Sequence, residues 1–199
     1  MIFTYTQFKP ARLFEITGMT PDLQQLWRRR GQLPWGNGKP RPITAIEAAE
    51  IFLRYQLSQV GVPPSESAEI GQVNAPIVLW YALLEVDGAC AVRGPLNRVD
   101  EFLEEFRMTH KVATDLTGIH QDTSYRFLYR FNGEQEFTAS FALPEIGPHS
   151  PFATLNVIDL HGIGSLLASR AESPLILVEI ADSTVPRSEW VTKFTGPRT

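Results

Sequence analysis

Residues 13–31 constrain the fold of this chain more than any other stretch, because they join a glycine turn to the start of a capped helix. Gly18 can adopt the positive φ that a tight turn between helices often requires. Thr20 is a good N-cap, and Pro21 stands at the first helical position, where proline is tolerated. We therefore predict a first helix over residues 10–17, a tight turn, and a second helix that begins at Pro21.

The second helix has a predicted apolar side and a predicted polar side. Apolar residues recur at i, i+4, i+7 and i+8, the spacing of one buried stripe: Met19, Leu23, Leu26 and Trp27. Polar residues occupy the opposite side and its tip: Thr20, Gln24, Gln25 and Arg28. Glutamine can pair with adenine, and arginine with guanine or a phosphate, so this side suits the major groove of DNA. A solvated polar face explains the stripe equally well, but not the arginines at 28–30.

A Gly- and Pro-rich segment over 31–44 follows and carries Lys39 and Arg41. Its Gly36-Asn37-Gly38 run is typical of a tight turn. Beside a DNA-reading helix, a basic loop of this size would act as a wing that contacts backbone phosphates. A plain linker is the alternative interpretation.

A third helix is predicted over residues 45–60, with Thr44 and Glu47 as its capping box. Its apolar stripe has six members: Ile46, Ala49, Phe52, Leu53, Leu57 and Val60. After a break at 61–65, we expect a short helix over 66–70.

Charge is unevenly distributed along the chain. Residues 1–44 hold seven basic and two acidic side chains, a net charge of +5, whereas residues 45–199 have a net charge of −9. A basic head on an acidic body suits a nucleic-acid partner at the head only. Chance clustering of the basic residues is the alternative.

Residues 10–71 resemble the winged-helix DNA-binding domain of the MerR family and its excisionase-like relatives. The runs Gly18-Met19-Thr20-Pro21 and Arg29-Arg30-Gly31 carry the resemblance. Further matches are the wing arginine, the helix cap and the end of the third helix: Arg41, Ile43, Thr44 and Val60-Gly61-Val62. The chain departs from the family at Gln25, which stands where a phosphate-binding arginine is usual.

The resemblance implies a winged helix-turn-helix DNA-binding domain over 1–72. The pattern of the remaining residues predicts an α+β dimerisation or effector domain over 73–199, so the expected fold class is α+β. The resemblance also implies double-stranded DNA as partner and a homodimer whose C-terminal domain dimerises or binds a small-molecule or protein effector. Base contacts are expected from the second helix: Gln24, Gln25 and Arg28, with Thr20 at its tip. Phosphate contacts are expected from four basic residues: Arg12, Arg29, Lys39 and Arg41.

The C-terminal part does not continue the family pattern. Residues 74–86 are nearly all apolar, which predicts a buried helix if Pro76 lies in its first turn and a buried strand if not. A short strand is expected at 89–92 and an amphipathic helix at 96–108.

Asn132-Gly133 separates two alternating segments, over 125–131 and 134–143, and predicts a β-hairpin. The aromatic and basic alternation of its first strand can bind single-stranded nucleic acid, although a half-buried sheet face is the commoner origin. Four later segments complete the expectation: a loop over 145–151, a helix from the cap Asn156 to 171, a strand over 174–180, and a loose tail over 182–199 in which only Trp190 and Phe194 dock.

Catalytic and metal-binding patterns are not found in the sequence. The histidines lack metal-ligand spacing with Cys90 or a carboxylate pair: His110, His120, His149 and His161. Phosphate-binding loops, dinucleotide-binding glycines and a nucleophile elbow are also lacking. We therefore expect no enzymatic activity, no cofactor and no metal, and we interpret Cys90 as a small buried hydrophobe rather than a thiolate sensor.

The cellular setting is expected to be cytoplasmic. One cysteine cannot form an internal disulfide, which favours a reducing compartment. Residues 1–7 lack the features of a signal peptide, and the most apolar run, over 75–86, is too short to span a bilayer.

The functional prediction is a sequence-specific DNA-binding transcriptional regulator that acts as a dimer. One alternative is an architectural DNA-binding protein of the excisionase-like or phage type. Another is a protein-interaction module, antitoxin-like or scaffold-like, with an ancillary DNA-binding head.

Overall fold

The computed structural model describes residues 1–33, 39–119, 125–145 and 154–196. Within these residues the chain has seven α-helices and three small sheets, which confirms a mixed α+β fold. Several sequence predictions lie outside the described residues: the Gly36-Asn37-Gly38 turn, most of the 145–151 loop, His120 and His149.

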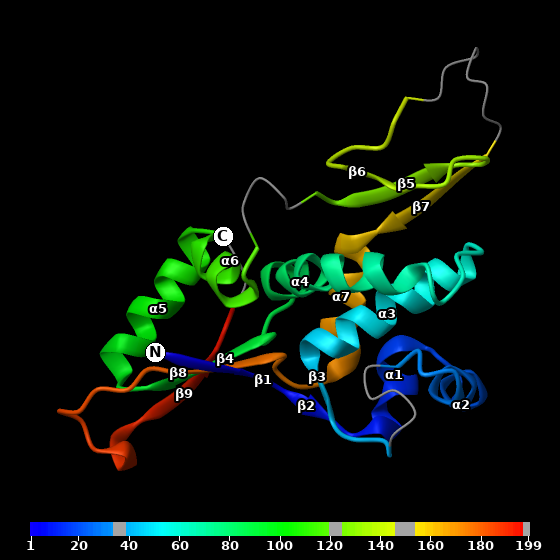
Figure 1. Ribbon diagram of the computed structural model, residues 1–199. Coiled ribbons are helices and arrows are strands. Elements are labelled where there is room, and N and C mark those ends of the chain that lie inside the picture. Colours follow the sequence, from blue (N-terminus) through cyan, green and yellow to red (C-terminus); the bar gives the residue numbers. More distant parts are fainter. Residues whose placement is uncertain (34–38, 120–124, 146–153, 197–199) are drawn as a thin grey trace.

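The centre of the molecule is the helix α4 (Ser67–Glu85). Three other helices pack around it, α3 (Ala45–Gln59), α6 (Lys111–Thr117) and α7 (Leu160–Ala171). Figure 1 shows α4 passing behind α3 and alongside α7, with a sheet below and a sheet above this helical layer.

α4 unites two elements that the sequence predicted separately. The expected short helix over 66–70 and the apolar element over 74–86 are one continuous helix, and Pro76 lies in its interior rather than in its first turn. An interior proline removes one backbone hydrogen bond from the helix. Burial of α4 among three helices offsets that loss, so the helix continues where local sequence predicts a break.

The larger sheet has four strands in the order β1-β8-β4-β9. Its members are β1 (Ile2–Tyr5), β8 (Ile176–Glu179), β4 (Cys90–Gly94) and β9 (Val191–Phe194). β4 and β8 run parallel, and the outer strands are antiparallel to their neighbours. The prediction of a loose C-terminal tail is wrong. The chain after β8 forms the short helix η3 (Arg187–Glu189) and then β9, which hydrogen-bonds to β4.

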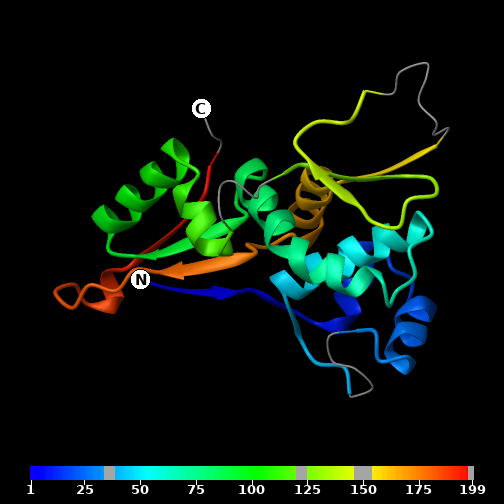
Figure 2. The same cartoon turned by 45° about the horizontal axis from the view of Figure 1, so that its top comes forward.

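One face of this sheet is covered by α5 (Leu96–Met108) and α6, as the two views in Figures 1 and 2 show. Lys193 of β9 forms an ion pair with Asp100 of α5, at 2.6 Å. The Tyr5 hydroxyl of β1 donates a hydrogen bond to the carbonyl of Leu116 in α6, at 3.2 Å. Cys90 is fully buried, as predicted, and burial raises the pKa of its thiol to about 12.

The predicted hairpin is confirmed as β5 (Phe127–Phe131) and β6 (Thr138–Ser140), and β7 (Leu155–Asp159) adds a third strand. The predicted start of the next helix, after Asn156, is therefore wrong. Residues 155–159 form a strand, and α7 starts at Leu160. Residues 155–159 form a strand because they hydrogen-bond to β5, and the local helical pattern gives no sign of that partner.

The apolar face of the hairpin also differs from the prediction. Leu128, which the alternation grouped with the arginines, is buried opposite Ile158, whereas Phe141 is 65 % exposed. The aromatic side chains of β5 are half-buried.

The N-terminal elements lie beside α3 and α7. They are β2 (Gln7–Phe8), η1 (Pro10–Arg12), α1 (Leu13–Thr17) and α2 (Pro21–Arg29), and β2 pairs with β3 (Ile43–Thr44). The Thr44–Glu47 capping box at the start of α3 is present as predicted.

The predicted boundary between residues 72 and 73 falls inside α4. β1, from the predicted N-terminal part, pairs with β8 from the C-terminal part, and one hydrophobic core contains residues of both. The boundary therefore does not coincide with a break in the structure, and the independence of the two parts stays a prediction. Among the described helices, none combines the length and apolar character needed to cross a membrane.

The closest approach of α4 and α7 is at Gly164. A Cβ added there would lie 2.5 Å from the Val78 carbonyl oxygen and 2.8 Å from the Ala82 nitrogen, both backbone atoms of α4. A Cβ at Gly162 would meet only Asp159, at an ordinary 3.5 Å.

We predict that Gly164→Ala lowers the free energy of unfolding by about 1–3 kcal/mol, because the helices must move apart. Gly162→Ala, about half a turn earlier on the same helix, is the matched control and should change the free energy of unfolding by less than about 1 kcal/mol. Urea unfolding followed by circular dichroism measures both, and equal stabilities for the two variants would contradict the packing described above.

Candidate nucleic-acid interface

The turn between α1 and α2 has the predicted construction. Gly18 ends α1 in the left-handed conformation, at φ 78°. The Thr20 hydroxyl accepts a hydrogen bond from the Leu23 amide, at 3.4 Å, and so caps α2 with Pro21 at its first position. Leu13 and Ile16 are buried as expected, which fixes α1 against the core.

α2 packs through Trp27, which is 2 % exposed, and through the buried Met19 that precedes it. The predicted stripe is wrong at Leu26, which is 41 % exposed. The buried side of α2 is centred toward Trp27, about 100° around the helix from Leu26, and so leaves Leu26 at the surface.

A buried arginine holds α2 against α3. Arg54 is 5 % exposed, and its guanidinium lies 5.4 Å from the centre of the Trp27 ring. The same group pairs with Glu50 at 3.1 Å and donates to the Pro64 carbonyl at 3.4 Å. The cation–π contact and the ion pair together orient α2 on the core.

The last turn of α2 and the residue that follows it are basic and largely exposed. Gln25, Arg29 and Arg30 are exposed, and Arg28 is half-buried. None of the ion pairs between described residues involves Arg28, Arg29 or Arg30. These three guanidiniums are therefore available to an anionic ligand.

Besides Thr20, which caps α2, three predicted DNA contacts already have intramolecular partners, namely Gln24, Arg12 and Arg41. The Gln24 amide donates to the Met19 carbonyl at 2.7 Å. Arg12 pairs with Glu15 and with Glu172, and it donates to the carbonyl of Arg170 at 3.3 Å near the end of α7.

Arg41, the predicted wing arginine, pairs with both carboxylate oxygens of Glu47. The hydrogen bond and the charge of Glu47 raise the pKa of Arg41. Burial raises the pKa of Glu47, but Arg41 and the hydrogen bonds from Thr44 outweigh it, so the pKa of Glu47 lies below its usual value. Arg41 thus helps to hold Glu47, the capping-box glutamate, at the start of α3.

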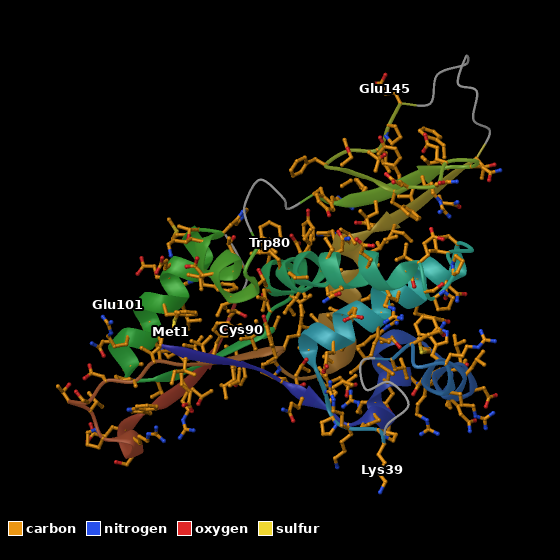
Figure 3. The ribbon with its side chains drawn as sticks, viewed as in Figure 1. Met1, Lys39, Trp80, Cys90, Glu101 and Glu145 are labelled. Atoms are coloured by element: carbon orange, nitrogen blue, oxygen red, sulfur yellow. The ribbon has the colours of Figure 1, made fainter. Side chains whose placement is uncertain are left out.

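A hollow of about 290 Å³ lies on this surface, between α2, the start of η1 and the chain before β3. Its lining comprises three prolines, three predicted contacts and two further residues: Pro10, Pro21, Pro40, Gln24, Gln25, Arg28, Asp22 and Leu33. Lys39, next to Pro40, is exposed, and its side chain extends away from the molecule in Figure 3. Gln25 and Arg28 thus line the same hollow as Pro40, the residue next to Lys39.

Sequence reasoning left out Arg30, Pro10 and Pro40 from this surface. Arg30 is exposed beside Arg29, and the run of three arginines was the signal that could have included it. The two prolines lie far apart in the sequence, and only the pairing of β2 with β3 brings their segments together.

A second group of titratable side chains lies between α4, α7 and the β5–β7 sheet. Arg126 forms two hydrogen bonds with Asp159, and His161 lies 3.4 Å from Glu85 and packs edge-on against Tyr81. In the described part of the chain, no cluster of three or more His, Cys, Asp or Glu could hold a metal ion.

Comparison of this chain with protein-family models, with curated proteins and with solved structures finds no match.

The Glu47 geometry predicts an acid-sensitive contribution to stability. Because the folded-state pKa of Glu47 is depressed, the contribution is fully present above the unfolded-state pKa of about 4.3 and is lost as the pH falls through the folded value. Glu47→Gln should therefore be less stable than the native chain at pH 7, and the difference should shrink below about pH 4. Thermal unfolding at a series of pH values measures this, and a difference that stays constant down to pH 3 would refute it.

Proposed function

We propose that this chain is a sequence-specific, double-stranded-DNA-binding transcriptional regulator, whose α2 enters the major groove from a winged helix-turn-helix arrangement. The observation that carries the proposal is the outer surface of α2, a capped helix with Arg28, Arg29 and Arg30 outside every ion pair between described residues. Unpaired guanidiniums at one end of an exposed helix suit a phosphate backbone and guanine edges.

Base reading is assigned to Gln25 and Arg28. Gln25 is exposed, and Arg28 lines the same hollow beside it. A glutamine amide matches adenine, and an arginine fork matches guanine, each with two hydrogen bonds. Gln24 would read a base only after releasing the Met19 carbonyl, and Thr20 is held as the helix cap.

Phosphate binding is assigned to Arg29, Arg30 and Lys39, each of which is exposed. Arg12 and Arg41 would first have to leave their carboxylate partners, so their contribution to DNA affinity is expected to be smaller. The net charge of +5 on residues 1–44 supports the attraction of this end to DNA.

A dimer is part of the proposal, because α2 has only nine residues and one such helix contacts few base pairs. Two copies related by a two-fold axis would read two half-sites and so gain specificity. The remainder of the chain, with its two larger sheets, supplies surface for a small-molecule or protein effector.

Selection of bound sequences from random duplex DNA with the full chain tests the proposal. We predict an enriched inverted repeat, with Gln25→Ala and Arg28→Ala each lowering affinity for the selected site by roughly 5- to 150-fold and relaxing base preference. Arg107→Ala, on the exposed surface of α5, is the matched arginine control and should bind as the native chain does. Unchanged affinity and preference in the α2 variants would refute the assignment.

Salt dependence separates phosphate contacts from base contacts. Arg29→Ala should weaken binding to all sequences alike and reduce the slope of log affinity against log salt by about one. Binding that falls steeply with salt but enriches no sequence would favour the architectural alternative. Weak, salt-insensitive DNA binding with a stoichiometric protein partner would favour the interaction module.

A further inference from the structure

Strand β1 forms one outer edge of the four-stranded sheet, and its only paired neighbour among the described strands is β8. Figure 2 shows β1 along the margin of the molecule. We propose that β1 pairs antiparallel with β1 of a second copy of this chain, which joins two four-stranded sheets into one of eight strands.

The backbone of β1 directs two of its residues toward the open edge. The Thr6 amide donates to the Leu175 carbonyl at 2.9 Å, which marks Thr6 as a residue that hydrogen-bonds toward β8. In an antiparallel ladder this role alternates along the strand, so Thr4 also hydrogen-bonds toward β8. The amides and carbonyls of Phe3 and Tyr5 therefore point outward, away from β8.

β1 has only four residues, but its edge lacks the charges and the proline that also keep sheet edges apart. Residues 1–8 include no charged side chain and no proline, and Ile2 is 67 % exposed. The opposite edge differs, because Lys193 of β9 extends its charge toward Asp100. Edge strands without charge or proline leave their backbone groups open to pairing with another strand.

A second copy fits this edge better than an unrelated strand, because the outward residues complement themselves. With Thr4 opposite Thr4 of the second copy on a two-fold axis, Phe3 stands opposite Tyr5 on both sides of the axis. Each Phe3–Tyr5 pair then exchanges two backbone hydrogen bonds, which makes four across the interface. The absence of charge in residues 1–8 means that identical strands meet without repulsion, although the whole chain carries a net charge of −4.

The side chains permit this register. Tyr5 lies on the sheet face that α6 covers, because its hydroxyl bonds to a carbonyl of α6. Thr4, the neighbouring residue in β1, lies on the opposite face and is exposed. The two Thr4 side chains would thus meet on the open face, as a threonine–threonine pair of the kind that stabilises antiparallel sheets. The inference concerns the dimer within the proposed function but does not rest on DNA binding.

The test is the self-association of the full chain, measured by sedimentation equilibrium in the absence of DNA. We expect a dimer for the native chain. Thr4→Lys and Thr4→Glu each place two like charges opposite one another and should raise the dimer dissociation constant at least about tenfold. An equimolar mixture of the two variants should restore the dimer as a heterodimer, which excludes misfolding as the cause of the loss.

Thr192→Lys is the matched control, because Thr192 is an exposed threonine on β9 at the other edge of the same sheet. It should leave the dimer unchanged. A native chain that is monomeric, or Thr4 variants that dimerise like the native chain, would overturn the proposal. A loss of DNA binding with the dimer intact would instead count against the proposed function alone.

Amide hydrogen exchange gives a second readout at the level of single residues. In the native dimer, the Phe3 and Tyr5 amides should exchange slowly. In Thr4→Lys these two amides should exchange at least about tenfold faster, while the amides of residue 4 and Thr6 stay protected by β8. Fast exchange of Phe3 and Tyr5 in a dimeric native chain would show that the copies meet elsewhere and would overturn the proposal.

Discussion

Helix α4 is stable only if it is covered on nearly every side, since apolar residues occupy most of its circumference. No single neighbour in sequence can provide that cover. α3 precedes it, whereas α6 and α7 follow it at increasing distances along the chain, and all three lie against it. The sheets are placed in turn by these helices, β4 by the turn after α4 and β7 by its direct continuation into α7. The close contact at Gly164 is therefore a condition for the whole arrangement.

The candidate DNA-reading surface depends on this core through two groups of contacts. Trp27 and Arg54 fix α2 to α3, while Arg170 of α7 lies 5.5 Å from the Phe52 ring and donates to the Ile16 carbonyl of α1. A shift of α7 would therefore be transmitted to α1 and to the turn before α2. Any ligand of the C-terminal part that moved α7 would act on the orientation of α2 by this route.

Local patterns predicted elements whose signals lie within a few residues. The Gly18 turn, the Thr20 cap, the capping box of α3 and the limits of α5 follow from spacing and capping chemistry alone. The failures share a different cause, namely partners distant in sequence. Residues 155–159 are extended because β5 pairs with them, and residues 191–194 are ordered because β4 does. At the candidate site, sequence identified the side chains of α2 but not the carboxylates that pair with Arg12 and Arg41. Glu172 reaches Arg12 across the fold, whereas Glu47 is local to Arg41 but was assigned to the capping box alone.

The pairing of β1 with β8 sets an order of events during synthesis. β1 leaves the ribosome before β8, and the strand that pairs with it follows about 170 residues later. At roughly 5–20 residues per second, β1 waits on the order of ten to thirty seconds with both edges open. During that interval the neutral segment 1–8 is accessible to nascent chains on neighbouring ribosomes and to chaperones that hold extended apolar segments. The larger sheet is thus completed late, because its edge strand β1 is made long before the strand that it pairs with.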